Sequence, residues 1–202
     1  MIALDIEASG VDYHKNSIIS IGAVDMEDKD KRFYGECRVW EGSHLAEDTM
    51  VFLQMTEEQF RDPLKQTEGE LIEKIMRWIE SCHDRTLLGQ NVSFDRDFLK
   101  AGCERIHHEY PLAHRTVDTH TLCYMHMIKR GLVPPFNEEK HRTALNLDVI
   151  LQYCGIPEEP RPHNALTGAL SHAEVAHRFF MMKSFYQSLI GLRYRGLRSK
   201  YY

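Results

Sequence analysis

Several features that define whole classes of protein are absent from this chain of 202 residues. No apolar run approaches the roughly 20 residues that a membrane-spanning helix needs. There is no internal repeat and no low-complexity tract, and because an apolar run begins at residue 2 we expect no signal peptide. These absences predict a single folded domain that does not cross a membrane, and the expected location is the cytoplasm.

Cysteine is also sparse and has no pattern. The five cysteines are widely spaced, and no two of them form a C-x-x-C pair. An odd, scattered set is typical of reduced thiols in the core of a cytosolic protein. The sequence therefore argues against a disulfide framework and against a zinc site built from cysteine.

An excess of positive charge is missing over most of the chain. The formal net charge of −5 argues against a uniformly basic nucleic-acid binder. No acid follows Glu174, however, whereas six basic residues do. We divide the chain into a domain over residues 1–185 and a basic tail over residues 186–202. In Arg193–Tyr202, arginine and lysine alternate with tyrosine, which suits single-stranded nucleic acid, a frayed terminus or a helix that docks on a partner subunit.

What the chain does contain is a series of strand and helix patterns typical of an α/β domain. The first ten residues, Ser17–Met26 and Arg32–Trp40 read as antiparallel strands, with a charged turn at Glu27–Lys31. Helices and short strands then alternate, which predicts a mixed sheet with helices on its faces. The later elements are expected as strands at Arg85–Gln90 and Arg115–Asp118, and as helices at Thr67–Cys82, from Ser93 as N-cap, at Thr119–Arg130, at Asn146–Cys154 and from His163 to about Ser188.

The remaining segments are expected to be irregular. Glu41–Pro63 shows only a capping-box pattern that begins at Thr56. Gly131–Thr143 reads as a loop, and Pro157–Pro162 reads as a linker with three prolines.

Three separated segments carry polar groups at the ends of the expected elements. Asp5 and Glu7 alternate with apolar residues, so in a strand both carboxylates point to one face. Two carboxylates on neighbouring positions of one strand face raise each other's pKa unless a cation lies between them. Mg²⁺ and Mn²⁺ prefer such oxygen ligands. Asn91 and Asp95 follow a short strand, and His163 precedes the last helix. Sites in open α/β sheets gather at such ends, so one shared cleft is expected.

These segments carry a family resemblance. Leu4–Gly10, Gly89–Leu99 and His163–Leu170 look like the three motifs of the DEDD-type 3′→5′ exonuclease superfamily, in its histidine-bearing branch. This branch includes ribonuclease T, oligoribonuclease and the proofreading subunits of bacterial replicative polymerases. The resemblance covers roughly residues 1–180, and it implies a ribonuclease-H-like fold with a mixed five-stranded sheet flanked by helices.

The resemblance further implies a metal-dependent hydrolase that trims single-stranded DNA or RNA from the 3′ end. Asp5, Glu7 and Asp95 would hold two Mg²⁺ or Mn²⁺ ions, and His163 would act as the general base. The terminal nucleotide would be held by a further group of residues. These are Ala8, Ser9, Gly10, Asn91 and Phe94, with Phe94 and Val11 as candidates to contact its base.

One position departs from the family pattern. The third motif carries an acid five residues after its histidine, and Gly168 stands at that position here. His172, four residues further along the same helix face, is the best-placed substitute ligand. The glycine is also compatible with a single ion and slower turnover, with a deliberately inactivated variant, and with a relative that binds nucleic acid without catalysis.

The expected activity is therefore a weakened 3′→5′ exonuclease. Two other functions stay open, namely a catalytically impaired binding protein or scaffold, and a proofreading module that acts only with a polymerase. The partner left open besides nucleic acid is a second copy of the chain or a polymerase. Gly168→Asp is expected to raise the activity in Mg²⁺ if the third motif is aligned correctly.

Overall fold

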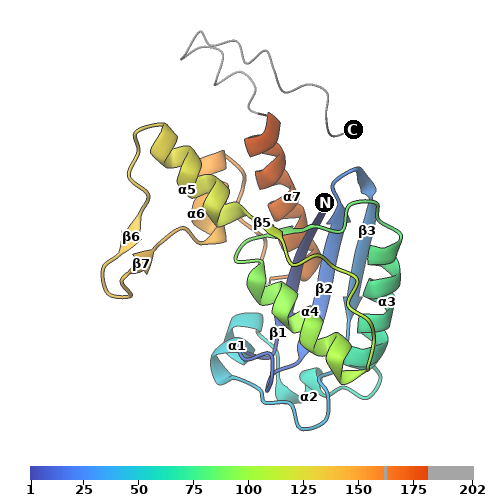
Figure 1. Ribbon diagram of the computed structural model, residues 1–202. Coiled ribbons are helices and arrows are strands. Elements are labelled where there is room, and N and C mark those ends of the chain that lie inside the picture. Colours follow the sequence, from blue (N-terminus) through green and yellow to red (C-terminus); the bar gives the residue numbers. More distant parts are fainter. Residues whose placement is uncertain (162, 182–202) are drawn as a thin grey trace.

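The computed structural model describes residues 1–161 and 163–181. The expected α/β architecture is confirmed, because a mixed five-stranded sheet in the order β3-β2-β1-β4-β5 lies between helices (Figure 1). The strands are β1 (Ile2–Ala8), β2 (Ile18–Asp25), β3 (Asp28–Glu36), β4 (Leu87–Gly89) and β5 (Thr116–Asp118), with β6 (Phe136–Asn137) and β7 (Arg142–Thr143) in a separate hairpin. The helices are α1 (Glu47–Leu53), α2 (Glu57–Phe60), α3 (Glu68–Glu80), α4 (Ser93–Arg105), α5 (Thr119–Lys129), α6 (Leu147–Cys154) and α7 (Ala165–Met181).

The pairing of β1 leaves half of one edge open. β1 runs antiparallel to β2 along its whole length, with Asp5 opposite Gly22 and Glu7 opposite Ser20. On its other side it is parallel to β4, which pairs only with Ile2 and Ala3. The backbone of the second half of β1 therefore needs other hydrogen-bond partners on that side.

Side-chain alternation on β1 separates a structural face of the sheet from a polar one. Ile2, Leu4 and Ile6 belong to the main apolar core together with α3 and α4, which cover one face (Figure 1). The α3 stripe is fully buried there, as its spacing predicts, and each large side chain contributes roughly 1.5–3 kcal/mol. Its members are Leu71, Ile72, Ile75, Met76 and Ile79. The opposite face of β1, with Asp5 and Glu7, looks toward α7.

Helix α7 lies unusually close to the sheet. A Cβ atom added to Gly22 on β2 would lie 2.1 Å from the carbonyl oxygen of Ala165, in the first turn of α7. Only glycine permits this approach, because the contact is with backbone that cannot rotate away. The small residues of α7 that face the sheet, Gly168 and Ala169, are both buried. Gly22 therefore fixes α7 directly above the strand that carries the acids.

Several expected boundaries were wrong. Strand β3 begins at Asp28, so the charged residues that we assigned to a turn lie mostly within the strand, and the turn is Met26–Glu27. The N-cap of α4 is Val92 rather than Ser93. Helix α7 begins at Ala165, two residues after His163. Its expected end near Ser188, the end of the domain at residue 185 and the basic tail lie outside the described residues.

Two segments that we expected to be irregular contain regular structure. Glu41–Pro63 holds α1 and α2, and Gly131–Thr143 holds the β6–β7 hairpin. Helix α1 gave no cap signal in the sequence, because Ala46 at its N-cap makes no side-chain hydrogen bond and Gln54, not glycine, takes the left-handed C-cap position. The capping pattern at Thr56 is present, since Gln59 Oε1 accepts a hydrogen bond from the Thr56 amide at 2.8 Å.

Two other helix caps follow the sequence. The Asp118 side chain accepts a hydrogen bond from the Thr121 amide at the start of α5, and Gly155 ends α6 in the left-handed conformation. Among the described residues, no helix combines the length and the apolar character needed to cross a membrane.

Candidate active site

The two acids of β1 lie where the sheet meets the beginning of α7. Asp5 and Glu7 share a face of the strand, as their alternation with Leu4 and Ile6 predicts. Burial, together with the carboxylates of Asp5 and Glu159, raises the pKa of Glu7 to about 8. A carboxyl group with that pKa holds its proton near neutral pH unless a cation approaches.

Asp95 reaches the same place from α4. Its Oδ1 accepts a hydrogen bond from the Ile6 amide at 3.0 Å, on the edge of β1 that β4 leaves open. The side chain is 3% exposed, and burial followed by the charge of Asp5 raises the pKa of Asp95 well above its ordinary value. Asp5, Glu7 and Asp95 are thus brought together, as expected, although they are separated by about 90 residues of chain.

Gly168 faces Asp5 from the first turns of α7. A Cβ atom at Gly168 would lie 2.2 Å from Asp5 Oδ2, so the Asp5 carboxylate fills the space where a side chain at this position would begin. One turn later, His172 Nε2 lies 3.4 Å from Asp5 Oδ1. His172 is 1% exposed, and its Nδ1 has no hydrogen-bond partner among the described residues. The glycine and the histidine together hold Asp5 against α7.

His163 lies just before α7, between a carboxylate and an aromatic ring. Its Nδ1 is 3.5 Å from Glu159 Oε2, and its ring stacks on Phe52 with centroids 4.6 Å apart and an interplanar angle of 16°. Its Nε2 is buried without a hydrogen-bond partner among the described residues. An imidazole oriented through one nitrogen, with the other left without a partner, is suited to exchange a proton with a bound molecule.

A pocket of about 340 Å³ joins Glu7 to His163. Its walls come from β1, β2, β3, the segment after α1 and the segment before α7. Tyr34 and Asn164 lie on its rim and are hydrogen-bonded to each other, with Asn164 Nδ2 donating to Tyr34 Oη at 2.9 Å. The full lining is Glu7, Ile19, Ser20, Tyr34, Glu36, Leu53, Gln54, Met55, His163 and Asn164.

The residues expected to hold a terminal nucleotide are placed in different ways. Ser9 is buried, and its hydroxyl donates to the His44 carbonyl at 2.8 Å and accepts from the Ser17 amide at 2.9 Å, so the side chain is fully engaged in structure. Ala8 and Gly10 are buried beside it. Of this segment, Val11 alone extends into solvent, at 83% exposure.

The two candidates near α4 also differ. Asn91 is exposed and has a positive φ of 53°. Phe94 is half-buried, with its ring centroid 4.8 Å from that of Phe98 in the core. Asn91 is therefore available to a ligand, whereas Phe94 is largely committed to packing.

The donor set suits a single hard cation by its chemistry, since a divalent ion would favour the ionised forms that burial, and then the neighbouring carboxylates, disfavour at Glu7 and Asp95, whose pKa values are raised. Among the described residues, however, no three His, Cys, Asp or Glu side chains stand in a metal-binding arrangement. Gly168 stands where an acid is expected, and Asp5 contacts His172. The described residues therefore offer no separate set of ligands for a second metal ion.

Some residues of this site could not be found from the sequence. Glu159 lies in the proline-rich segment that reads as a linker, and Phe52 lies in a helix without cap signals. The side chain of Glu159 is only 6% exposed, and its Oε1 has no hydrogen-bond partner among the described residues. The acidic first turn of α1, with Glu47 and Asp48, could have indicated the helix but not the role of Phe52 within it.

Comparison with known proteins now decides the family. The sequence profile of the family described as "Exonuclease" matches residues 2–176. The chain belongs to this exonuclease family. The resemblance indicated by the three motifs is thereby confirmed. No curated protein matches the chain by sequence.

Solved structures of nucleases share its fold. The nuclease domain of 3′hExo, described as a DEDDh family member bound to rAMP, has a TM-score of 0.65 at 17% identity, with 90% of this chain and 92% of that one covered. Cell-death related nuclease 4 has a TM-score of 0.67 at 14% identity, with 90% and 64% covered. E. coli exonuclease I in complex with a dA16 oligonucleotide has a TM-score of 0.66 at 14% identity, with 88% and 40% covered. The chain thus spans less than half of exonuclease I.

Proposed function

We propose that this protein removes nucleotides from the 3′ end of single-stranded DNA or RNA with the help of a divalent metal ion. The observation that carries the proposal is the convergence of Asp5, Glu7 and Asp95 beside a pocket that also contains His163. Membership of the exonuclease family supports the reaction type. The dA16 oligonucleotide bound by exonuclease I, which shares the fold, supports a single-stranded substrate.

In this proposal the three carboxylates hold one Mg²⁺ or Mn²⁺ ion. Such an ion would stabilise the charge that develops on the phosphodiester. Asp95 is positioned by the Ile6 amide, and Glu7 is held in a buried pocket wall. Asp5 would leave His172 to join them, or His172 would itself become a ligand. Both variants use residues that already lie together.

His163 is proposed as the general base. Glu159 orients the ring through Nδ1, and Phe52 limits its rotation by stacking. The buried Nε2 would gain its partner from a water or from the substrate. A proton taken from water at this nitrogen would generate the attacking hydroxide, and a positioned base of this kind contributes about a hundredfold or more.

The test is to incubate 3′- and 5′-labelled DNA and RNA oligomers with Mg²⁺, Mn²⁺ or a chelator. We expect products that shorten one nucleotide at a time from the 3′ end, only with metal. His163→Ala should lower the rate by about a hundredfold or more. His83→Ala is the matched control, because the His83 side chain is 89% exposed. Equal loss in both variants, or degradation in the presence of chelator, would contradict the proposal.

A second function is favoured by one observation. Gly168 and the contact between Asp5 and His172 leave the site short of ligands, which suits a relative that binds nucleic acid with little turnover. In that case the oligomers bind with the same affinity in Mg²⁺ and in chelator, and no shortened products form at any metal concentration.

A further inference from the structure

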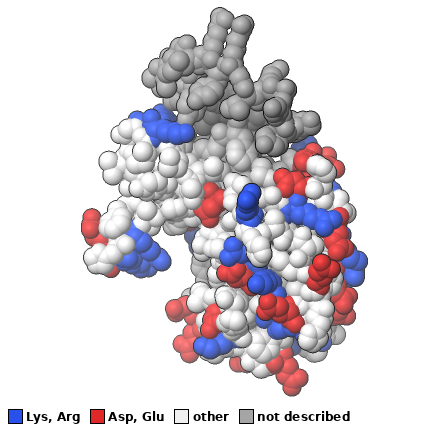
Figure 2. Space-filling model, in the orientation of Figure 1, with Lys and Arg blue, Asp and Glu red and all other residues white. Residues whose placement is uncertain are grey.

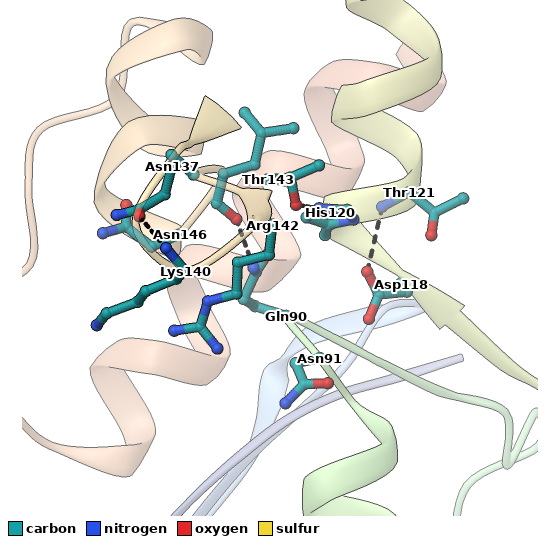
Figure 3. A pocket seen from close by; sticks show the side chains of 12 residues that line it. Gln90, Asn91, Asp118, His120, Thr121, Asn137, Lys140, Arg142, Thr143 and Asn146 are labelled. Carbon is teal, nitrogen blue, oxygen red and sulfur yellow. Dashed lines mark hydrogen bonds between the residues drawn. The ribbon is translucent and has the colours of Figure 1, made fainter. Parts of the chain in front are cut away.

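A second pocket, of about 620 Å³, lies beside the β6–β7 hairpin (Figure 3). One wall is the hairpin with the segment that follows it, and the other is formed by the end of β4 and the beginning of α5. No part of the site proposed above includes this hairpin. The lining residues are Gln90, Asn91, Asp118, His120, Thr121, Asn137, Lys140, Arg142, Thr143, Ala144, Leu145 and Asn146.

The hairpin is held in place rather than left as a free loop. His120 Nε2 and Thr143 Oγ1 are hydrogen-bonded at 2.6 Å, which ties β7 to α5. Gln90 Nε2 donates to the Leu145 carbonyl at 2.9 Å, which ties the following segment to the end of β4. Both bonds are drawn in Figure 3. The walls of the pocket are therefore fixed relative to each other.

The pocket concentrates positive charge that has no internal partner. Lys140 and Arg142 are exposed, and neither side chain makes an ion pair or hydrogen bond within the described chain. Basic side chains on the hairpin are visible at the left of Figure 2. Several arginines elsewhere are paired with acids, such as Arg105 with Glu68 and Arg178 with Glu174. In a protein with a net charge of −5, two unpaired cations at one pocket favour an anionic ligand.

The one acid in the lining is held by backbone amides and makes no ion pair with Lys140 or Arg142 within the described residues. Asp118 accepts hydrogen bonds from the amides of Thr121 at 3.1 Å and Val92 at 3.3 Å. Glu138 and Glu139 belong to the hairpin turn but are not part of the pocket wall. Amide side chains supply neutral donors, namely those of Asn91, Asn137 and Asn146. The lining thus combines cations with amide donors, as phosphate sites do.

The pocket and the carboxylate site are linked through the chain around Asn91 and through the contact of β4 with β1. Asn91 lines the pocket, and Asp95 follows it by four residues, in the first turn of α4. A Cβ atom at Gly89, next to the lining, would lie 2.9 Å from the carbonyl oxygen of Leu4, the neighbour of Asp5. In Figure 3 the side chains of Arg142 and Asn91 extend toward the same open space. A strand whose 3′ end lies at the carboxylates could therefore continue past Asn91 to the hairpin.

We propose that this pocket binds a backbone phosphate of the nucleic-acid strand upstream of its 3′ end, through Arg142 and Lys140. The inference rests on the function proposed above, and it assigns the hairpin a role in holding the strand while its end is hydrolysed. Contacts of this kind carry no base information, so they make binding dependent on salt and on strand length but not on sequence.

The experiment measures binding of a labelled single-stranded 12-mer in chelator, by fluorescence anisotropy at several salt concentrations. Arg142→Ala should weaken binding about threefold to tenfold at low salt and reduce the slope of log K against log salt by about 0.7. Lys140→Ala with Arg142→Ala should reduce the slope about twice as much. Lys29→Ala is the matched control, because Lys29 is an exposed cation on β3, at the opposite edge of the sheet from β5.

The outcomes separate this proposal from the activity. An Arg142-dependent slope in a protein that hydrolyses nothing would support the pocket and overturn only the exonuclease proposal. Equal slopes for Arg142→Ala and Lys29→Ala overturn the pocket, whatever the activity. Titration with inorganic phosphate and adenosine monophosphate tests whether the pocket binds a small phosphate compound and not the strand. Arg142-dependent binding of these compounds, with unchanged binding of the 12-mer, would also overturn the proposal.

Discussion

The two faces of the sheet differ in the size and polarity of the side chains that cover them. The face under α3 and α4 is packed with large side chains such as Leu4, Ile72 and Ile75, all fully buried. The face under α7 uses Gly22, Gly168 and alanines, and it places the acids of β1 in the narrow space between strand and helix. The first face provides most of the apolar burial, whereas the second gives up side-chain volume so that polar groups meet. A change on the first face should therefore alter stability alone, whereas a change on the second should alter stability and chemistry together.

The largest expected effect comes from adding one methyl group on each face. In Gly22→Ala the new Cβ meets the Ala165 backbone at 2.1 Å, and helix α7 has to move. In Gly35→Ala the new Cβ meets Leu71 Cδ1 at 2.5 Å, and a side-chain rotation relieves the contact. We expect a loss of about 3 kcal/mol for Gly22→Ala and about 1 kcal/mol for Gly35→Ala.

Urea unfolding measures both changes, and oligonucleotide hydrolysis by the folded protein measures the site. Gly22→Ala should lower the hydrolysis rate per folded molecule as well as the stability, because it displaces the helix above Asp5. Gly35→Ala should leave that rate unchanged. If the two variants lose the same stability and retain the same rate, the two faces are not specialised as described.

The second expected effect concerns the missing side chain of α7. Gly168→Asp adds a fourth carboxylate and has to displace Asp5 Oδ2, which lies 2.2 Å from the position of the new Cβ. Asp5 can rotate, so the change is tolerated, and it would release Asp5 from His172 toward Asp95. We expect tighter Mg²⁺ binding and faster hydrolysis, by about tenfold or more if the added charge supplies a metal ligand.

Gly168→Asn is the matched control for that change, because it has the same shape without the charge. It should displace Asp5 in the same way and should not increase the Mg²⁺ affinity measured by calorimetry. Should both variants behave alike, or should Gly168→Asp leave affinity and rate unchanged, the alignment of the third motif would be wrong.

The contrast between the faces also shows why some features are predictable from the sequence. The acids of β1 and the stripe of α3 follow period-two and helical patterns, which are local and therefore readable from the chain. The placement of Asp95 was suggested by its motif, but its bond to the Ile6 amide depends on where β4 ends. Phe52 reaches His163 only through tertiary packing, and Glu159 reaches it from four residues earlier in a segment that reads as a linker, so no local signal marks either residue.

The hairpin pocket could not be predicted from the sequence either, because it also depends on tertiary contacts. Pro134 and Pro135 made Gly131–Thr143 read as a loop, and the two residues of each strand are too few to show alternation. The hairpin that carries Lys140 and Arg142 is fixed beside α5 by the hydrogen bond between His120 and Thr143, which are 23 residues apart. Charge in a short loop is ordinarily solvated, so only the folded arrangement marks these two cations as neighbours of the site.

The last expected effect is a pH dependence of stability that belongs to the α7 face. The pKa of Glu7 is raised from 4.5 to about 8, so the folded state favours the protonated carboxyl. The stability that this group contributes is fully present below its unfolded pKa and is lost as pH rises through about 8. In chelator, the free energy of unfolding should therefore fall between about pH 4.5 and about pH 8, and Glu7→Gln should make this fall smaller.

Two further groups modify this pH dependence of the free energy of unfolding. Asp95 contributes with the same sign, since its pKa is also raised, so part of the fall should persist in Glu7→Gln. Excess Mg²⁺ should oppose the fall in the wild type, because a cation stabilises the ionised carboxylates that the metal-free fold disfavours. Urea unfolding across this pH range, with chelator or with Mg²⁺, measures all of these effects. An identical pH slope in the wild type and Glu7→Gln would mean that burial and the neighbouring carboxylates do not hold Glu7 protonated. The electrostatic basis for a cation between these acids would then be lost.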